Sequence, residues 1–385
     1  MKIPKSAEFI INVLNNHSYE AYVVGGCVRD CIMGRTPLDF DITTSAQPEM
    51  VRALFSKTVD TGIEHGTITV LIDGESFEVT TYRIDGEYND CRRPDTVEFT
   101  KNLKDDLERR DFTINAVAYH KDIGFVDPFF GIPDIDKKLI RGVGNPDKRF
   151  KEDALRMMRC VRFSVQLGFD IEEETYKALV DNVGLIKKIS MERVREELVK
   201  ALLGDYLENI FLFEKTGLLE NIGFVECDYR LLSNVEKNII HRLAVVLKGC
   251  ENAKELLLRF KFSNKEIKAV MVVLEYLSVD IGNDLYEVKK IISVVGLERF
   301  LDIIEVKSAL GEDMAEVKEM YAQILIERPP LGLKDLKVDG KMLIKEKICE
   351  HGRDVGRVLA FLLDAVLREP RVNTREELLR LAASC

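Results

Sequence analysis

The side chains best suited to chemistry lie close together near the start of the chain: a Gly-Gly pair at 25–26, followed by two aspartates, Asp39 and Asp41. Side chains alternate along a strand, so the two carboxylates would share one face on either side of Phe40. Two negative charges held this close repel each other unless a cation lies between them. Carboxylate oxygens suit Mg²⁺, which commonly arrives with the phosphates of a nucleotide. The aspartates therefore predict a metal site that serves a nucleotide.

The glycines predict the phosphate-binding half of the same site. A short apolar strand over residues 22–24 ends at Gly25 and Gly26, whose missing side chains allow a tight turn and a close approach to a phosphate. A helix predicted over residues 28–33 follows the turn. Most Gly-Gly pairs are plain turns and many Asp-x-Asp pairs lie on surface strands, so neither motif is specific alone. Their order and short separation favour nucleotide binding.

The composition predicts several folded domains in a reducing compartment. A chain of 385 residues is too long for one compact core, and its hydrophobic content of 46% supports folded cores throughout. The eight cysteines show no Cys-x-x-Cys spacing and the first residues lack an apolar signal segment, so we expect a cytoplasmic protein. No apolar run reaches the roughly 18–20 residues that span a bilayer, which argues against a membrane role.

The charge distribution limits the modes of nucleic-acid binding. A net charge of −10 argues against indiscriminate binding, because such affinity comes from neutralising many phosphates. Two segments nevertheless concentrate cations, one from Lys148 to Arg162 and a looser one from Lys334 to Arg380. For the second segment, a solvated helix face is the alternative interpretation.

Local patterns change near residue 140, which predicts a mixed α/β domain followed by helices. Before this point, short β-rich segments alternate with helices, and Asp73-Gly74 is typical of a hairpin turn. After Gly144, apolar residues recur near the 3.6-residue helical period. The Pro329-Pro330 pair is the best candidate for a late boundary. The predicted strands cover 21–24, 40–43, 68–72, 77–82 and 116–120, and the early helices cover 6–15 and 48–55.

Further charged residues extend the predicted site, each with a plainer alternative. Glu78 lies on the strand after the hairpin, either as a third acid that acts as a base or tunes the metal site, or as a surface residue of an edge strand. Arg109 and Arg110, before a predicted apolar strand, can grip triphosphate oxygens or form a solvated salt-bridge cluster. Asp111 can accept a hydrogen bond from a ribose hydroxyl or hold an arginine in place.

A helical motif at residues 152–159 offers the chemistry to distinguish nucleobases. Residues three apart share a helix face, so Asp153, Arg156 and Arg159 would line one side. A carboxylate accepts from the amino group of cytosine or adenine, and a guanidinium donates to the neighbouring ring nitrogen. Guanine and uracil present the opposite pattern and mismatch at both positions. The alternative is a set of surface ion pairs worth about 0.2–0.5 kcal/mol each.

The segment from Arg83 to Phe99 is long and polar for a connection between strands. Loops of this kind inside a compact domain are usually functional or disordered. Arg92 and Arg93, followed by Pro94, favour a moving substrate lid.

Together these segments resemble the bacterial class II tRNA nucleotidyltransferases, the CCA-adding enzymes, within the polymerase-beta-like superfamily. They occur in the family's order and cover the first half of the chain densely, whereas the remainder matches by helical character and by the stretch from Asp339 to Glu377. The matching segments are Gly25-Gly-Cys-Val-Arg29-Asp30, Asp39-Phe-Asp41, Arg92-Arg-Pro94, Arg109-Arg-Asp111 with Asn115, Asp127-Pro128 with Gly131, Glu152-Asp-x-x-Arg156 and Glu192-Arg-Val-Arg-Glu-Glu197.

The resemblance implies an α/β head of the polymerase-beta type, with a small mixed sheet and helices, followed by an all-α neck, body and tail. The implied bounds are 1–140 for the head, 141–204 for the neck, 205–328 for the body and 329–385 for the tail. Asp39 and Asp41 would bind two Mg²⁺ ions and act in catalysis, with Glu78 as a third acid. Body and tail would hold the acceptor arm and elbow of a tRNA.

The resemblance also implies which residues surround the nucleotide. Asp153 and Arg156 of the neck would form the base-reading edge, in agreement with their hydrogen-bonding chemistry, whereas the segment from Glu192 to Glu197 would be structural. The expected nucleotide-binding residues are Gly25, Gly26, Arg29, Arg109, Arg110, Asp111, Asn115, Asp153, Arg156, Arg159 and Arg162.

The implied reaction is attack by the 3′ hydroxyl of tRNA on the α-phosphate of CTP or ATP, with release of pyrophosphate and without a template. Relatives add C-C-A, only C-C or only the last A, and the complete loop at 83–99 disfavours addition of C-C alone. Remoter alternatives are a poly(A) polymerase, which would carry a strongly basic C-terminal extension, and a non-catalytic RNA-binding scaffold, which would not need Asp39 and Asp41.

Overall fold

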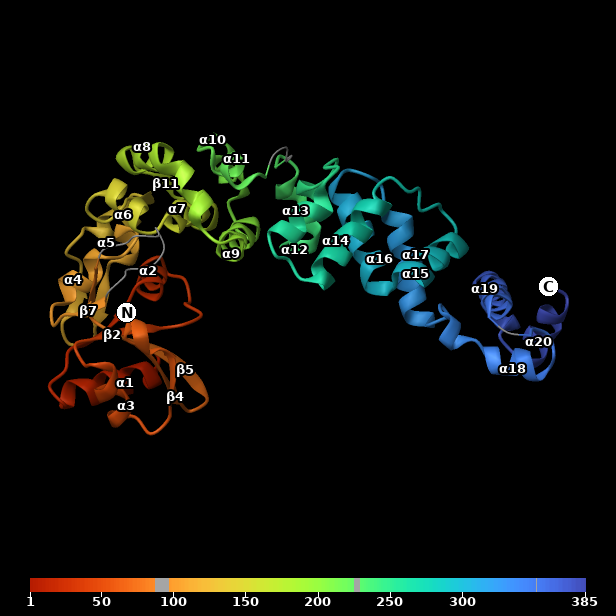
Figure 1. Cartoon of the computed structure of the whole chain (residues 1–385), viewed down its shortest axis with the longest axis horizontal. Helices are drawn as coiled ribbons and strands as arrows, with labels where there is room; N and C mark the ends of the chain where they lie inside the picture. Colours follow the sequence, from red (N-terminus) through yellow and green to blue (C-terminus); the bar gives the residue numbers. More distant parts are fainter. Residues whose placement is uncertain (87–96, 225–228, 351) are drawn as a thin grey trace. The chain divides into compact units, whose positions relative to one another are not determined.

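The computed structural model describes residues 1–86, 97–224, 229–350 and 352–385. By its internal contacts the chain divides into two compact units, Met1–Val225 and Glu226–Cys385 (Figure 1). The first unit begins with a mixed sheet and continues with helices, and the second unit is helical, as the sequence predicted. The candidate site lies in the first unit.

A seven-stranded sheet forms the centre of the first unit. Its strand order is β3-β4-β5-β2-β1-β8-β9, and neighbours run antiparallel except for the parallel pair β2 and β5. The sequence predicted five of these strands but missed β3 and β9. Both are edge strands with mostly exposed or half-buried residues, so they lack the apolar alternation of a strand packed on a core. The strands are β1 (Ala21–Val24), β2 (Asp41–Thr44), β3 (Thr58–Gly62), β4 (Thr67–Ile72), β5 (Glu75–Thr81), β8 (Ala118–His120) and β9 (Gly124–Val126).

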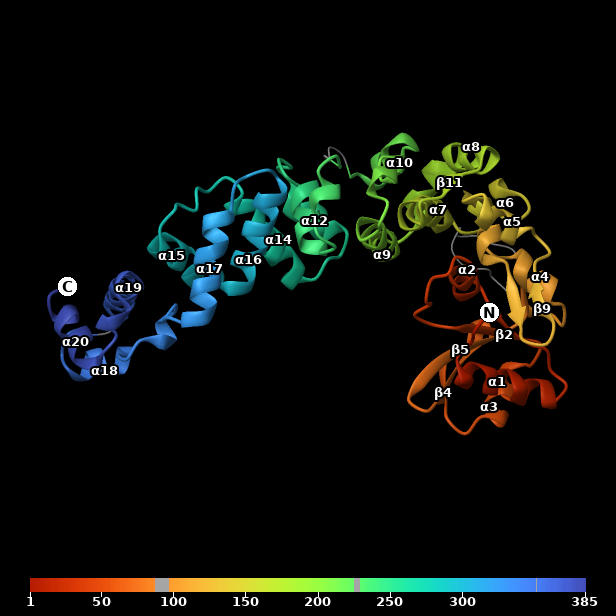
Figure 2. The ribbon, with the colours of Figure 1, turned by 180° about the vertical axis from the view of Figure 1, so that it is seen from behind.

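Helices cover both faces of this sheet (Figures 1 and 2). Side chains of β1 alternate between two cores: Val23 joins the core that contains Ile11 of α1, whereas Val24 joins the core that contains Leu107 of α4. The helices are α1 (Lys5–Asn16), α2 (Gly26–Ile32) and α3 (Pro48–Leu54) on the first side, and α4 (Leu103–Glu108) on the second.

The same alternation decides where Asp41 points. In β2, Ile42 joins the core beneath α1, so Asp41 and Thr43 face the α4 side of the sheet. The Thr43 hydroxyl there donates a hydrogen bond to Asp106 of α4 at 3.1 Å. Asp41 therefore shares a side of the sheet with α4 and with the arginines that follow this helix.

Glu78 lies next to Asp41 in the sheet. β5 runs parallel to β2 with Val79 opposite Ile42, so the residue before each, Glu78 and Asp41, also lie side by side. β5 is flanked by β4 and β2, and the alternative interpretation of an edge strand is therefore wrong. The Glu78 side chain is nevertheless exposed to solvent.

Short strands and helices complete the first unit. The short β10 and β11 pair in parallel, which ties the end of the sheet region to the helices after residue 144. The remaining elements are β6 (Arg83–Asp85), β7 (Val97–Phe99), β10 (Leu139–Ile140), β11 (Asp170–Ile171), α5 (Gly131–Asp136), α6 (Pro146–Glu152), α7 (Leu155–Leu167), α8 (Glu173–Asn182), α9 (Met191–Leu202), α10 (Leu212–Lys215) and α11 (Leu218–Ile222).

The second unit consists of helices with apolar cores. Its last three helices share a core of their own, which includes Leu343, Leu362 and Leu378. In the described parts of the whole chain, no helix is both long and apolar enough to cross a membrane. The helices are α12 (Ile239–Val246), α13 (Ala253–Arg259), α14 (Asn264–Tyr276), α15 (Leu285–Val295), α16 (Leu297–Ala309), α17 (Ala315–Glu327), α18 (Gly340–Lys345), α19 (Arg353–Arg368) and α20 (Arg375–Ala383).

Gly131 supplies a test of the packing that supports the site. A Cβ atom added at Gly131 would lie 2.1 Å from the carbonyl oxygen of Thr113 and 2.7 Å from Val117. We expect Gly131→Ala to lower the free energy of unfolding by about 2 kcal/mol, because backbone atoms cannot move aside as a flexible side chain can. Gly184→Ala is the matched control, since nothing lies within 4 Å of its Cβ position. Equal melting temperatures for the two full-length variants would contradict the tight packing.

Candidate active site

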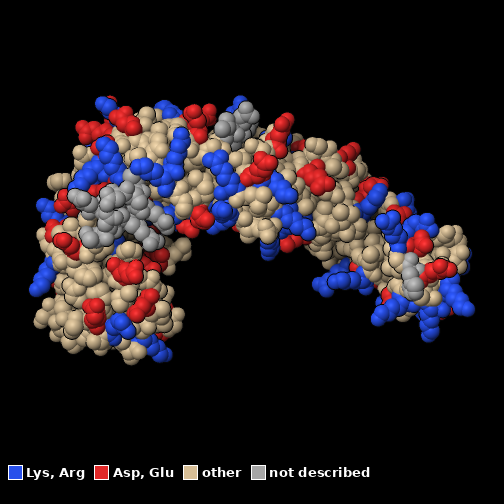
Figure 3. All heavy atoms as spheres, in the orientation of Figure 1, with Lys and Arg blue, Asp and Glu red and all other residues tan. Residues whose placement is uncertain are grey.

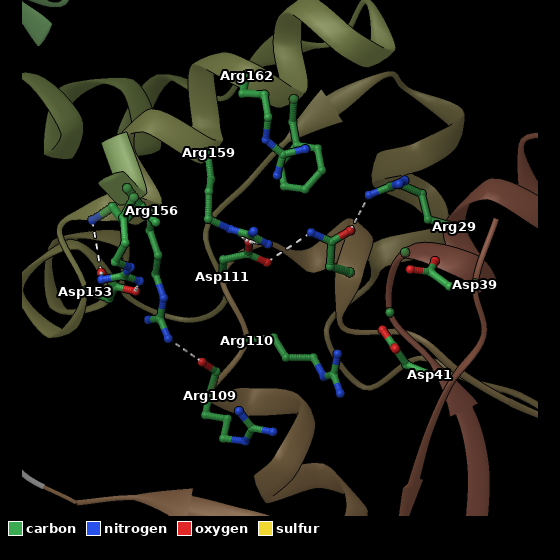
Figure 4. Close-up of a pocket in the computed structure, with 16 residues that line it drawn as sticks. Arg29, Asp39, Asp41, Arg109, Arg110, Asp111, Asp153, Arg156, Arg159 and Arg162 are labelled. Atoms are coloured by element: carbon green, nitrogen blue, oxygen red, sulfur yellow. Dashed lines mark hydrogen bonds and ion pairs between the residues drawn. The ribbon is translucent and has the colours of Figure 1, made fainter. Parts of the chain in front are cut away.

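One pocket of the first unit collects most of the residues singled out from the sequence (Figure 4). It has a volume of about 530 Å³ and is lined by seven arginines and four aspartates. Asp39 and Asp41 lie at one end, Asp153 and Arg156 at the other, and further arginines lie between them. The lining residues are Gly25, Gly26, Arg29, Asp39, Asp41, Arg109, Arg110, Asp111, Asn115, Asp153, Leu155, Arg156, Arg159, Arg162, Phe163 and Arg193.

The two aspartates line the same end of the pocket, but only Asp41 belongs to a strand. β2 begins at Asp41, whose partner Val24 is the last residue of β1. The chain then turns at Gly25 into α2, so β1 offers no further partner that could extend β2 back to Asp39. The predicted alternation along a strand is therefore wrong for Asp39, although both carboxylates reach the pocket.

The charges around Asp41 favour a bound cation. Desolvation by the surrounding protein, and then the charge of Asp39, raise the pKa of Asp41 to about 6, while Arg110 opposes the shift. Protein groups thus leave the negative charge at this point incompletely neutralised. Carboxylate oxygens are the ligands that hard divalent cations prefer, so Asp39 and Asp41 fit such an ion.

Glu78, unlike Asp39 and Asp41, does not line the pocket. Its charge nevertheless adds to the rise in the pKa of Asp41. Within the described residues, no three His, Cys, Asp or Glu side chains are grouped closely enough to hold a metal ion. The geometry therefore places Glu78 beside the pair rather than in a three-acid cluster.

Gly25 brings the backbone close to Arg110. Its φ of +83° is a conformation that side chains disfavour, and an added Cβ would lie 3.0 Å from Nη1 of Arg110. Nη2 of Arg110 lies 3.3 Å from Asp106, and its buried Nε has no hydrogen-bond partner in the described structure. Nη1 of Arg110 therefore lies beside the glycine turn, where it can donate to an anionic ligand.

Asp106 is a site residue that the sequence interpretation missed. Its fully buried carboxylate accepts hydrogen bonds from Nε and Nη2 of Arg109 at 3.0 and 2.8 Å, and it also pairs with Arg110. Burial opposes ionisation, but Arg109 and then Arg110 lower the pKa of Asp106 below its ordinary value. The signal was present, because an acid three and four residues before two arginines is the ion-pair spacing of a helix.

Asp111 holds an arginine in place. One of its oxygens accepts from the Phe112 amide and from Asn115, and the other lies 2.8 and 2.6 Å from Nε and Nη2 of Arg159. Burial would raise its pKa, but Arg159 and then Asn115 hold the pKa well below the usual range. A short 3₁₀ turn (Thr113–Asn115) follows, and it leads to β8, the strand predicted at 116–120.

The hydrogen-bond network continues from Asp111 toward α2. Asn115 also accepts a hydrogen bond from Nη1 of Arg29 at 2.6 Å. Three guanidinium groups surround the ring of Phe163 at 3.7 to 5.3 Å from its centre, within the range of cation–π attraction; they belong to Arg29, Arg159 and Arg162. The back of the pocket is therefore a rigid layer of arginines around one aromatic ring.

Arg162 is anchored by a carboxylate from α9. Its Nε donates to Glu197 at 2.5 Å, and both side chains are buried. Burial lowers the pKa of Arg162 to about 10, although Glu197 opposes the shift. Arg162 therefore stays charged at neutral pH.

Asp153 lies between two helices rather than on one. α6 ends at Glu152 and α7 begins at Leu155, and Asp153 has extended backbone angles, φ −136° and ψ 103°. Its carboxylate accepts the N–H of Leu155 at 3.1 Å, a local hydrogen bond that competes with a continuous helix. The predicted shared helix face is therefore wrong for Asp153, whereas Arg156 and Arg159 are both on α7. All three still line the pocket.

Arg156 is fixed by three acceptors. Its guanidinium donates to Glu152 at 2.8 Å and to the carbonyl oxygens of Arg149 at 3.2 Å and Arg109 at 2.8 Å (Figure 4). The bond to Arg109 connects α7 directly to the segment that follows α4. Arg92 and Arg93, the predicted lid residues, lie outside the described residues.

Curated proteins of known name resemble this chain along almost its whole length. A CCA-adding enzyme of Lactobacillus helveticus is 40% identical, covering 96% of this chain and 92% of that protein. A CCA-adding enzyme of Geobacillus thermodenitrificans is 38% identical, covering 96% and 93%. The chain belongs to the CCA-adding enzyme family.

Domain families and solved structures agree with this assignment. Three families match: the Poly A polymerase head domain at residues 21–141, the probable RNA and SrmB-binding site of polymerase A at 168–223, and the putative domain 2 of tRNA nucleotidyltransferase at 233–382. The Bacillus stearothermophilus CCA-adding enzyme in complex with CTP has 34% identity and a TM-score of 0.91, covering 100% of this chain and 98% of that one. Membership of the CCA-adding enzyme family implies the use of a divalent metal ion.

In this member of the CCA-adding enzyme family, sequence reasoning missed three pocket residues: Leu155, Phe163 and Arg193. Leu155 and Phe163 belong to the apolar residues whose helical spacing predicted a helix here, and both are buried while also lining the pocket. Arg193 was placed in a structural segment. Its position in the pocket depends on how α9 packs against α7, which local spacing does not reveal.

Asp111 supplies a pH-dependent test of this network. We expect Asp111→Asn to lower the free energy of unfolding by about 2 kcal/mol at pH 7, because the partly exposed Arg159 would lose its closest acidic partner. A carboxyl with a lowered pKa stabilises the fold above its ordinary pKa of about 4, and that stabilisation is lost as the pH falls below it. Urea unfolding should therefore give a constant difference from wild type between pH 5 and 8 and a smaller one at pH 3.5. A difference that grows toward acid would contradict this assignment.

Proposed function

We propose that this protein adds the sequence C-C-A to the 3′ end of tRNA from CTP and ATP, releasing pyrophosphate and using no nucleic-acid template. The observation that carries the proposal is the two-ended pocket, with paired carboxylates at one end and an Asp and Arg edge at the other. Near full-length relatives named CCA-adding enzymes support it, as does a solved relative bound to CTP.

Asp39 and Asp41 would hold Mg²⁺ at the catalytic end of the pocket. When bound, this ion supplies positive charge that lowers the pKa of a hydroxyl nucleophile and stabilises a leaving pyrophosphate. Glu78 lies beside Asp41 in the sheet and would add negative charge to the same region. The supporting observation is the incompletely neutralised charge at Asp41.

The middle of the pocket would bind the triphosphate. Nη1 of Arg110 lies beside the glycine turn, and Asp106, the buried carboxylate that pairs with Arg110, also orients Arg109. Gly25 and Gly26 also line this region at the start of α2, where the first N–H groups of a helix have no intrahelical acceptors. Guanidinium and backbone donors together suit phosphate oxygens.

The far end of the pocket would read the base. Asp153 would accept from the amino group of cytosine or adenine, and Arg156 would donate to the adjacent ring nitrogen. Uracil and guanine would present an oxygen to the carboxylate and an N–H to the guanidinium, so both would be rejected. The support is the position of Asp153 and Arg156 side by side at the end opposite the aspartate pair (Figure 4).

We assign the rest of the chain to tRNA binding, in a head, neck, body and tail divided near residues 140, 204 and 328. On the face shown in Figure 3, Lys and Arg side chains gather on the C-terminal segment, and Lys341, Arg357 and Arg375 there are exposed. Such cations suit contacts to phosphates of the acceptor arm or elbow. We propose a cytoplasmic location, which suits an enzyme that acts on tRNA.

Two tRNA substrates test the activity. One ends at the discriminator base and the other ends in C-C, and each is incubated with the protein, Mg²⁺ and labelled CTP or ATP. We expect the first to gain two C and then one A, and the second to gain only A. Addition of A to the second tRNA alone would indicate an A-adding enzyme. Long tails of A would indicate a poly(A) polymerase. No incorporation into either tRNA would contradict the proposal.

Asp39→Ala tests the catalytic end. We expect it to abolish incorporation of both nucleotides while tRNA affinity is retained, because the change removes a metal ligand and leaves the RNA-binding surface unchanged. Asp122→Ala is the matched control, since Asp122 is exposed and lies outside the pocket. Incorporation and a tRNA gel-shift assay measure the two effects. Equal loss of tRNA binding in Asp39→Ala would show a structural role instead.

A further inference from the structure

Arg193 of α9 reaches into the pocket and contacts one side chain of the base-reading edge. Its Nη1 and Nη2 lie 3.2 and 2.8 Å from Oδ1 and Oδ2 of Asp153, a two-pronged ion pair. The Arg193 side chain is 26% exposed and lines the pocket, whereas Asp153 is 17% exposed. The pair is therefore at the ligand-facing surface of the first unit.

The hydrogen bonds that Asp153 already makes leave its carboxylate able to accept one more donor. Oδ1 accepts from the Leu155 amide and from Arg193, while Oδ2 accepts only from Arg193 among the described residues. Each carboxylate oxygen can accept two hydrogen bonds. One acceptor position thus remains on Oδ2, and the direction of that position is set by Arg193.

The pair is not needed to hold α9 against α7. The buried pair of Arg162 and Glu197 already joins these helices, and Val194 and Leu198 bury apolar surface on the same helix as Arg193. A partly exposed ion pair adds little stability to such a contact. Its bidentate geometry is better suited to fixing the orientation of the carboxylate.

We infer that Arg193 is a positioning residue for base selection: it orients the Asp153 carboxylate as an acceptor, so that cytosine and adenine are accepted and uracil and guanine are rejected. This inference rests on the proposed function of Asp153. The other half of the edge is built in the same way, because Glu152 pairs with Arg156 at 2.8 Å. Each reading side chain therefore has a partner of opposite charge that fixes its direction.

Arg193→Gln tests the inference, because glutamine can donate to one carboxylate oxygen but cannot make the two-pronged pair. We expect the ratio of kcat/KM for CTP to kcat/KM for UTP to fall by roughly 10-fold or more. The fall should come from a higher KM for CTP, while kcat for CTP changes by less than about 3-fold. Arg193→Lys, which keeps the charge, should restore part of the discrimination. Arg52→Gln is the matched control, since it breaks an exposed pair with Asp60 and neither residue lines the pocket.

A double-mutant cycle separates orientation from a merely structural role. If Arg193 acts through Asp153, then Arg193→Gln should add nothing to the loss of discrimination already caused by Asp153→Asn. A lower melting temperature or lower kcat with an unchanged ratio of CTP to UTP would overturn the inference, as would additive effects in the cycle.

The same experiment distinguishes failure of the inference from failure of the proposed function. Absence of C and A addition by the wild-type protein would contradict the function itself. Unchanged discrimination in Asp153→Asn would contradict the base-reading role of Asp153 and with it the inference. Loss of discrimination in Asp153→Asn but not in Arg193→Gln would overturn the role of Arg193 alone.

Discussion

The ion pair between the buried carboxylate of Asp111 and the partly exposed guanidinium of Arg159 is the interaction on which the rest of the pocket depends. Asp111 lies between the arginines after α4 and the turn that contains Asn115, while Arg159 belongs to α7. Through Asn115 the same carboxylate is linked to Arg29 in the helix that begins at the glycine turn. Loss of Arg159 would leave the buried Asp111 carboxylate uncompensated, at a cost of about 3–5 kcal/mol. One carboxylate thus fixes the glycine turn, the sheet region and α7 relative to one another.

The pairing of arginines with carboxylates also explains how so many cations can share one pocket. A site for a triphosphate must concentrate positive charge, yet like charges in a protein of low polarisability repel strongly. Here most guanidinium groups have an acidic partner that reduces the repulsion and also fixes the direction of the N–H donors. Arg110 is held more loosely than the others, with one pair to Asp106 at 3.3 Å and a buried Nε that makes no hydrogen bond in the described structure. The acidic partners are Asp30 for Arg29, Asp106 for Arg109 and Arg110, Asp111 for Arg159, Glu152 for Arg156, Glu197 for Arg162 and Asp153 for Arg193.

Local chemistry and the family resemblance predicted most members of the pocket, but not how they are held. The glycine turn, the hairpin at 73–74 and the change to helices follow from short-range patterns, and the structure has each of them. Asp39 was assigned to a strand because a sequence does not show where the neighbouring strand ends. Asp153 was assigned to a helix because its own hydrogen bond to Leu155 competes with the helical pattern. The partnership with Arg193, forty positions away, arises only from the packing of α9 on α7.

A protein edge that reads an amino group and a ring nitrogen treats cytosine and adenine alike. Such an edge therefore cannot decide the order in which C and A are added. The two bases differ in size: with the reading edge held fixed, the glycosidic bond of adenine lies further from it than that of cytosine. The α-phosphate must still reach the catalytic end near Asp41 in both cases. Under the proposed function, either the distance between the edge and the aspartate pair or the conformation of the ribose and triphosphate between them would therefore differ between the addition of C and of A. Because Arg156 donates to the carbonyl oxygen of Arg109, a hydrogen bond links the edge to the segment that would bind the phosphates.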